Sequence, residues 1–282
     1  MLCAYFFVLF KKTPGFDWRT DFVKLPLTMY EDFARYYDQI HSSLTADLPF
    51  ILQLAQGNGG PILDLGCGTG RLLFPLAQAG FQIVGVDNSP QMLAIANKRL
   101  AAQPEKVRAL VTIWEKDMRN LALVHTEAKF TLALFSFNTL LHMREGEIVE
   151  LLKRVADLIA SGGKIFIDLE NPFLLAETID QNKAIFETSF MDEATSKPVE
   201  QWSQTSLDSI AQTLTVMWQF RTNEKESGTQ TVKIVYHYLY PHQIVLLLQK
   251  AGFRLLRISG NYEGEPFQED SERLLLLADL PG

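Results

Sequence analysis

Short apolar runs alternate along this chain with helical segments, and this alternation constrains the fold more than any other feature. Strands that alternate with amphipathic helices form a parallel sheet that is covered by helices on both faces. The runs are apolar almost throughout, which is typical of strands buried on both sides. The pattern predicts strands at 61–65, 81–86, 109–114, 130–137 and 164–169, with helices at 30–40, 44–55, 72–79, 91–101 and 145–159.

The alternation stops after Pro172. Strand-like segments at 197–206, 210–221 and 230–240 follow each other with no helix between them, which indicates a small antiparallel sheet. The first pattern then resumes with a helix at 241–251 and two strands, at 253–258 and 273–278.

The two patterns together predict an α/β fold. We expect a doubly wound, Rossmann-like, mostly parallel seven-stranded sheet with an antiparallel last strand, plus a small inserted antiparallel β-sheet. The expected domains are an N-terminal extension at 1–25, a main domain at 26–182 and 241–282, and an inserted antiparallel segment at 183–240. We interpret this last segment as a substrate lid or a dimer contact.

Composition excludes several classes of partner. The chain has 282 residues, a formal net charge of −7 and no basic run longer than two residues, so we expect no nucleic-acid partner. The apolar residues 1–10 are too few to span a membrane, which takes about 20 residues, and no basic residue precedes them, so we expect no membrane contact. Cys3 and Cys67 cannot form a disulfide framework, which favours a reduced, cytoplasmic setting.

A glycine loop, Asp64-Leu-Gly-Cys-Gly-Thr-Gly-Arg71, directly follows one strand and opens a helix. Alternate glycines let the backbone approach a ligand, and the N-terminus of the next helix adds free N–H groups and a positive dipole end. A plain strand-to-helix packing turn is the alternative. The dinucleotide fingerprint needs its third glycine at position 71, where this chain has arginine, and this disfavours a nicotinamide cofactor.

Acidic residues follow the next two strands. Asp87 can accept hydrogen bonds from two vicinal ribose hydroxyls, and its alternative role is to cap the helix that Pro90 opens. Asp117 can accept a hydrogen bond from the exocyclic amine of adenine, and its alternative is an ordinary turn residue. Both follow strand ends on the edge where open parallel sheets bind ligands, so the series that Asp64 begins predicts one ligand site there.

These segments, in this order, resemble the motifs of the class I S-adenosylmethionine-dependent methyltransferases. The resemblance covers about 30–280, and it is greatest to small-molecule methyltransferases, including sugar N-methyltransferases, that carry an antiparallel sheet before their last two core strands. The matching segments are DLGCGTGR at 64–71, VGVDNSPQML at 84–93, KDMRNL at 116–121, FTLALFSFNTLLHM at 130–143 and SGGKIFIDL at 161–169.

The resemblance implies S-adenosyl-L-methionine as the cofactor. The glycine loop would hold its methionine part, the acid after the second strand its ribose and the residues after the third strand its adenine. An aromatic residue ending the fourth strand would lie beside the sulfonium. Aromatic residues of the first helix would close over the cofactor, with a core-facing stripe as the alternative for Tyr37. The implied cofactor-binding residues are Tyr30, Tyr37, Asp64, Gly66, Gly68, Asp87, Asn88, Asp117, Met118 and Phe135.

The chemistry implied by the resemblance places few demands on the protein. A sulfonium methyl is already electrophilic, so a base is needed only when the acceptor must lose a proton. Glu170 and His142 are the candidates, with a solvent-facing or helix-capping histidine as the alternative for His142. We expect in-line methyl transfer to nitrogen or oxygen, rather than carbon, of a small-molecule acceptor, without a metal and with a homodimer left open. The alternatives are a non-catalytic S-adenosylmethionine-binding regulatory module and an NAD-dependent oxidoreductase.

Overall fold

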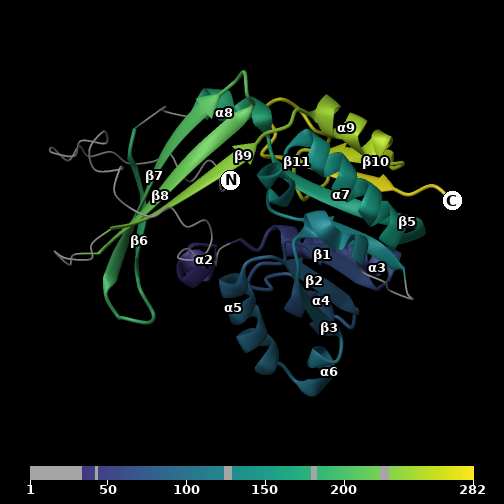
Figure 1. The fold of residues 1–282 in the computed structure, drawn as a ribbon, viewed down its shortest axis with the longest axis horizontal. Helices are drawn as coiled ribbons and strands as arrows, with labels where there is room; N and C mark the ends of the chain where they lie inside the picture. Colours follow the sequence, from purple (N-terminus) through teal and green to yellow (C-terminus); the bar gives the residue numbers. More distant parts are fainter. Residues whose placement is uncertain (1–33, 42–43, 124–128, 179–182, 223–228) are drawn as a thin grey trace. The chain divides into compact units, whose positions relative to one another are not determined.

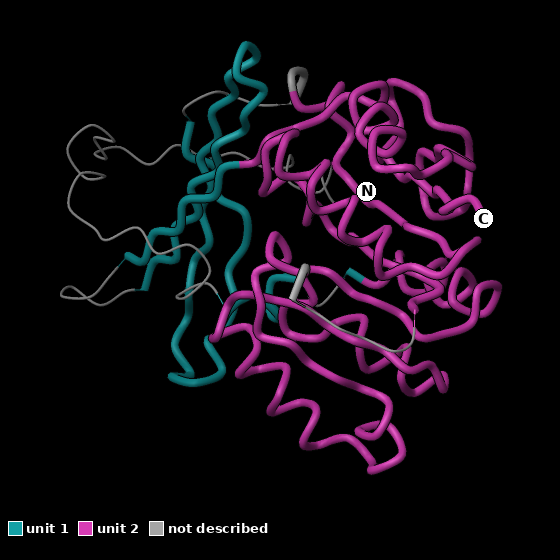
Figure 2. Tube along the Cα trace, turned by 45° about the vertical axis from the view of Figure 1, so that its right-hand side comes forward, with its two compact units in different colours: residues 1–44, 179–235 teal, residues 45–178, 236–282 magenta. Residues whose placement is uncertain are grey.

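A computed structural model describes residues 34–41, 44–123, 129–178, 183–222 and 229–282. The predicted extension 1–25 and Tyr30 lie outside these ranges. The chain groups into a smaller unit, residues 1–44 with 179–235, and a larger unit, residues 45–178 with 236–282 (Figure 2).

The larger unit is built on a seven-stranded sheet (Figure 1). Strands β1 to β5 pair in parallel and β10 runs in the same direction, whereas β11 is antiparallel to both of its neighbours, β5 and β10. This confirms the predicted mostly parallel sheet with an antiparallel last strand. Across the sheet the order is β10 (Arg254–Ser259), β11 (Arg273–Asp279), β5 (Ile159–Glu170), β4 (Phe130–Phe135), β1 (Ile62–Leu65), β2 (Ile83–Asp87) and β3 (Val111–Glu115).

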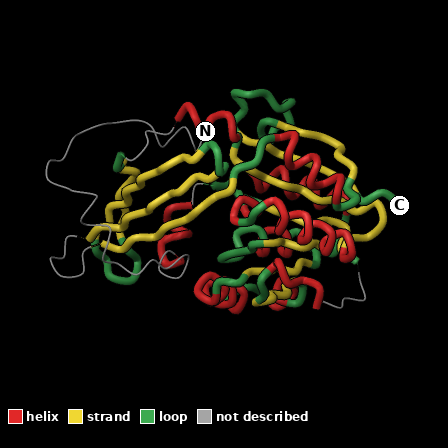
Figure 3. The backbone as a smooth tube through the Cα atoms, turned by 45° about the horizontal axis from the view of Figure 1, so that its top comes forward, coloured by secondary structure: helices red, strands yellow, loops and turns green. Residues whose placement is uncertain are grey.

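Helices cover both faces of this sheet, as Figure 3 shows. Leu63 and Leu65 of β1 face a core formed with α7 (Glu145–Leu158) and α9 (Pro241–Lys250). Ile62 faces the opposite core, formed with α3 (Asp47–Asn58) and α4 (Leu73–Gln78). Burial on both faces explains why the strands read as continuous apolar runs. The remaining elements are α5 (Pro90–Ala101), α6 (Glu105–Arg108), α8 (Pro172–Thr178), and the 3₁₀ turns η2 (Met118–Leu123) and η3 (Thr139–His142).

The described part of the smaller unit holds the second, antiparallel sheet and one helix. Tyr36 of helix α2 (Ala34–His41) packs against Phe190 and Phe220, with ring centroids 5.4 and 4.8 Å apart. The sheet order is β6 (Ile185–Met191), β7 (Pro198–Asp208), β8 (Thr213–Thr222) and β9 (Thr229–His237).

The second sheet therefore has four strands, and the prediction of three was wrong. The missed strand, β6, is a largely exposed edge strand with a bulge between Phe186 and Thr188. An exposed, bulged strand lacks the regular apolar alternation by which strands are recognised. The interpretation of 183–240 as a lid or a dimer contact stays a prediction. Within the described residues, no helix is long and apolar enough to cross a membrane.

Candidate functional site

The candidate site lies at the carboxyl ends of strands β1 to β5. The chain runs outward from β1 to β2 and β3, and then returns to β4 on the other side of β1. Such a reversal is the point where open α/β sheets bind ligands. The sequence-predicted residues of the larger unit follow these strand ends.

The three glycines of the loop after β1 all have positive φ, but they have different surroundings. A Cβ on Gly66 would lie 2.7 Å from the Thr139 side chain, and a Cβ on Gly70 would lie 2.6 Å from the Phe74 ring. At Gly68, with φ of 54°, a Cβ would meet no atom within 4 Å. Packing therefore requires the outer two glycines, whereas Gly68 borders open space that suits close approach of a ligand.

The helix after the loop contributes less than the sequence suggested. It begins at Leu73 and has six residues. A macrodipole needs a longer run of aligned peptide units, so the dipole argument carries no weight here. The remaining arguments for a ligand at the loop are the close backbone approach that its glycines allow and the acidic residues around it.

Asp87 connects the end of β2 to the glycine loop. Its Oδ2 accepts a hydrogen bond from Gly68 N at 2.8 Å, and its Oδ1 accepts one from Ser89 N at 2.8 Å. The N-cap of α5 is Ser89, whose Oγ accepts from Met92 N at 3.3 Å, so the alternative role of Asp87 as the cap was wrong. A carboxylate has about four acceptor positions, so the Asp87 carboxylate can still accept from a ligand hydroxyl beside its backbone donors. The next residue, Asn88, is exposed.

Asp64 lies within β1 and is almost fully buried, with 2% of its surface exposed. Burial raises the pKa of its carboxyl to about 7, against the lowering influence of Arg71, while Asp87 and Asp47 raise it further. Arg71 itself is held in a two-pronged ion pair, with Nη1 and Nη2 donating to Asp47 at 2.7 and 2.6 Å. Asp64, Asp87, Asp47 and Arg71 therefore lie close enough together around the glycine loop for their charges to interact.

Asp117 already has a partner. Its carboxylate accepts from the Arg119 guanidinium, with a shortest contact of 2.6 Å, and from Arg119 N at 2.9 Å. These bonds lower the pKa of Asp117. Met118 begins η2 and packs partly buried against the core on the α7 face. A ligand amine at this position has to share the Asp117 carboxylate with Arg119.

Phe135 does not reach the edge of the site, because its side chain is fully buried in the core. The residues that follow it lie at the strand end instead. Tyr37 belongs to the smaller unit, where its ring lies 4.3 Å from that of His41.

The two candidate bases have different surroundings. The His142 ring packs 5.0 Å from that of Tyr236, and burial lowers its pKa to about 4. The expectation of a solvent-facing histidine is therefore wrong, and His142 is neutral near pH 7. Glu170 ends β5, and its backbone N donates to Asn138 Oδ1 at 2.7 Å.

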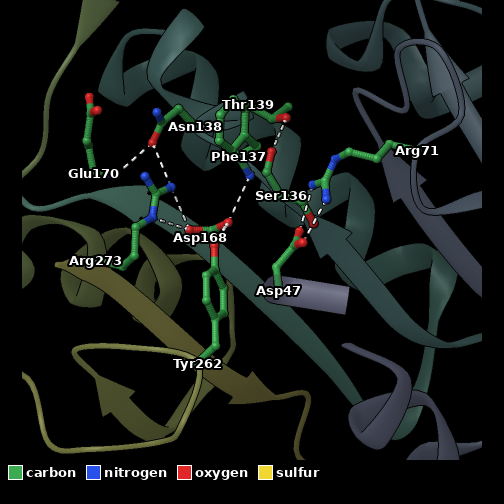
Figure 4. A network of polar contacts seen from close by, with 10 residues as sticks. All are labelled: Asp47, Arg71, Ser136, Phe137, Asn138, Thr139, Asp168, Glu170, Tyr262 and Arg273. Atoms are coloured by element: carbon green, nitrogen blue, oxygen red, sulfur yellow. Dashed lines mark hydrogen bonds and ion pairs between the residues drawn. The ribbon is translucent and has the colours of Figure 1, made fainter. Parts of the chain in front are cut away.

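A polar network that sequence reasoning missed occupies the β4–β5 side of the site (Figure 4). Its centre is Asp168, which is fully buried and accepts hydrogen bonds from Arg273 Nη2 at 2.6 Å, Tyr262 Oη at 2.9 Å and Phe137 N at 3.1 Å. A charged residue inside an apolar strand signals a buried partner, and Asp168 in KIFIDL carried that signal. Nothing local indicated which residues would satisfy it. Among the described residues, no group of side chains is arranged to hold a metal ion.

Comparison with known proteins agrees with this architecture. Residues 62–163 match a family model described as a methyltransferase domain. The chain is 26% identical over 261 residues to the cypemycin N-terminal methyltransferase of a Streptomyces species, across 89% of this chain and 98% of that protein.

Two solved structures share the fold. The CcbJ methyltransferase from Streptomyces caelestis has a TM-score of 0.76 at 23% identity, over 90% of this chain and 99% of that chain. CalS10 from Micromonospora echinaspora, an amino pentose methyltransferase solved with S-adenosylmethionine bound, has a TM-score of 0.62 at 18% identity, over 91% and 98%. These likenesses establish a common fold over about nine-tenths of the chain.

Proposed function

We propose that this chain, which belongs to the class I S-adenosylmethionine-dependent methyltransferases, transfers a methyl group to an amine nitrogen of a small molecule. The proposal rests on the glycine loop and on Asp87 beside it, at the point where the strand order reverses. It also draws on the similar proteins, because one is named an N-terminal methyltransferase and another an amino pentose methyltransferase.

The residues present fit the cofactor. Gly68 leaves open space where its backbone can approach a ligand, and the Asp87 carboxylate retains acceptor capacity for ribose hydroxyls. The buried Asp64 carboxylate suits the cationic amino group of the methionine part. When bound, S-adenosylmethionine supplies an electrophilic methyl and a neutral sulfide as leaving group. The chain has to bind and align, and alignment alone can contribute about 7–11 kcal/mol of barrier reduction.

The state of His142 favours an amine over an alcohol as acceptor. A neutral amine attacks through its lone pair, whereas an alcohol first needs a base. A histidine with a pKa near 4 is a poor base at pH 7, because its basicity is far below that of an ordinary imidazole.

The test is methyl transfer by the full chain to three acceptors: an amino sugar, a dipeptide with a free N-terminus and the hydroxyl analogue of the amino sugar. S-Adenosylhomocysteine formation is measured, and the methylated atom is located by mass spectrometry. We expect turnover of an amine and none of the hydroxyl analogue. Turnover of the hydroxyl compound alone, or cofactor binding without turnover of any acceptor, would contradict the proposal.

Cofactor binding should depend on the protonation of Asp64. Its carboxyl has a pKa of about 7, so it is charged above that pH and becomes neutral below it. As pH falls from 7 to 5.5, the cationic amino group loses its partner, and the Kd should rise by up to about tenfold per pH unit. Calorimetry from pH 5.5 to 8.5 measures this. The Asp64→Asn variant should bind weakly with a flat profile, and an unchanged slope in that variant would assign the titration elsewhere.

Substitution of Gly68 should weaken cofactor binding and have little effect on the packing of the protein. Gly68→Ala places a side chain at φ 54° in space that no protein atom occupies. Gly80→Ala is a matched control, because Gly80 has φ of 96° and equally open surroundings after α4. Both variants should lose about 1 kcal/mol of stability through backbone strain, but only Gly68→Ala should bind the cofactor at least tenfold more weakly. Equal affinities by calorimetry would show that Gly68 is a turn residue only.

A further inference from the structure

The turn after β4 holds an unusual backbone. Phe137 and Asn138 both adopt left-handed conformations, with φ of 53° and 67°. For an aromatic residue this region is an outlier that costs of order 1–3 kcal/mol, and it persists only where the surroundings impose it. Such strain gathers at functional sites more than in ordinary turns.

Asp168 imposes this backbone. Its Oδ2 accepts from Phe137 N at 3.1 Å, and its carbonyl oxygen accepts from Asn138 N at 3.0 Å. Asn138 Oδ1 in turn accepts from Glu170 N at 2.7 Å and from Arg273 Nη2 at 3.2 Å. Arg273 also donates through Nε and Nη2 to Asp168 Oδ1, at 2.9 and 2.6 Å. The turn is therefore fixed from both β5 and β11 (Figure 4).

The Phe137 ring lies near two guanidinium groups. The Cζ atoms of Arg71 and Arg273 lie 5.9 and 5.8 Å from the ring centroid. Asp47 and Asp168 hold these arginines, so neither is free to move with the ring. The ring stays partly exposed although both chain neighbours are buried. Phe135, two residues earlier, is fully buried in the core, whereas Phe137 is not. Burial in the core therefore does not explain the position of the Phe137 ring.

The carboxyl ends of the strands carry two sets of residues, which form two halves of the site. The residues that suit the cofactor follow β1, β2 and β3, whereas the Asp168 network belongs to β4, β5 and β11. Arg71, which follows the glycine loop, connects the two halves at the ring. A methyl group that leaves the cofactor half has to meet an acceptor in the other half.

We infer that Phe137 is the side chain against which the acceptor lies, and that Asp168 and Arg273 are positioning residues that hold it there. This inference rests on the proposed methyl transfer. Two guanidinium groups lie near this ring, so the contact is made with the part of Phe137 that stays partly exposed at the strand end. This part is apolar and takes C–H groups of a saturated ring or chain next to the reacting atom.

Phe137→Leu tests the contact, because it keeps an apolar side chain and removes the ring. With the best acceptor of the panel, the KM for that acceptor should rise tenfold or more, kcat should change less than threefold, and the Kd of S-adenosylhomocysteine should stay within twofold. Phe81→Leu is the matched control: Phe81 is also partly buried, but it precedes β2 and so lies at the opposite end of the strands. An unchanged acceptor KM, or an equal loss of S-adenosylhomocysteine affinity, overturns the inference.

Arg273→Lys tests the positioning role, because lysine keeps the charge and loses the fork that joins Asp168 to Asn138. The acceptor KM should rise about three- to tenfold, and more in Arg273→Gln, while the Kd of S-adenosylhomocysteine stays within twofold. A fall in kcat with no change in acceptor KM would contradict this role.

A binding measurement separates this inference from the proposed amine chemistry. 4-Fluorophenylalanine is placed at position 137, and the panel acceptors are added to the protein saturated with S-adenosylhomocysteine. We expect the fluorine resonance to shift with at least one acceptor, whether an amine or the hydroxyl analogue, even if no methyl is transferred. An unchanged resonance with every acceptor overturns the inference, whereas methylation of the hydroxyl analogue alone overturns only the amine proposal.

Discussion

Asp87→Ala should weaken binding of S-adenosylmethionine about thirty- to a hundredfold, or roughly 2–3 kcal/mol. We propose that Asp87 accepts hydrogen bonds from two ribose hydroxyls, which the substitution would remove, and hydrogen bonds to a charged group contribute about 1.5–3 kcal/mol each. It also releases Gly68 N and Ser89 N, while the bonds from Gly66 N and Cys67 N to Val86 O still join the glycine loop to the end of β2. Isothermal titration calorimetry at pH 8, where Asp64 is charged, measures the loss.

A matched control is available in the smaller unit. Asp208 Oδ1 also accepts two backbone N–H bonds, from Ile210 at 3.0 Å and Ala211 at 2.9 Å, but in an exposed turn between β7 and β8. Asp208→Ala should leave cofactor affinity unchanged. If Asp87→Ala binds as well as Asp208→Ala, Asp87 does not hold the ribose.

Arg273→Ala should destabilise the protein by about 3–5 kcal/mol, because it leaves the buried Asp168 carboxylate without its cation. Asp168 is fully buried and the Arg273 side chain is 13% exposed, so water replaces the lost partner poorly. Urea unfolding followed by circular dichroism measures the free energy of unfolding. Asp168→Asn should cost less, since the amide removes the buried charge and keeps one acceptor oxygen.

Arg254 provides the comparison on the adjacent strand. It forms a similar two-pronged pair with Asp279, at 3.0 and 2.6 Å, but its side chain is 65% exposed. Surface ion pairs contribute little, so Arg254→Ala should barely shift the urea midpoint. If Arg273→Ala lowers the free energy of unfolding no more than Arg254→Ala does, solvent screens the Asp168 network.

Local sequence indicated the glycine-loop side of the site more clearly than the side where Asp168 lies. The glycine loop and Asp87 follow directly from the ends of β1 and β2, and the sheet register brings these ends together, with Asp64 opposite Gly85. The role of Phe135 beside the sulfonium stays a prediction, and the structure places its side chain fully buried in the core. Apolar strand residues and exposed turn residues look alike in FTLALFSF, and only burial separates Phe135 from Phe137.

The sequence by itself determined the order along the chain of the strands in the seven-stranded sheet, the two-sided burial of that sheet and the glycine loop, because each depends on periodicity and backbone freedom within a few residues. Only the tertiary structure decided what surrounds Asp168. Its partners, Asn138, Tyr262 and Arg273, lie 30 to 105 residues away, and they meet because β11 inserts antiparallel between β5 and β10. Strand pairing brings these distant side chains together, and they stay paired because an unpaired buried charge is costly. A local sequence pattern indicates neither effect.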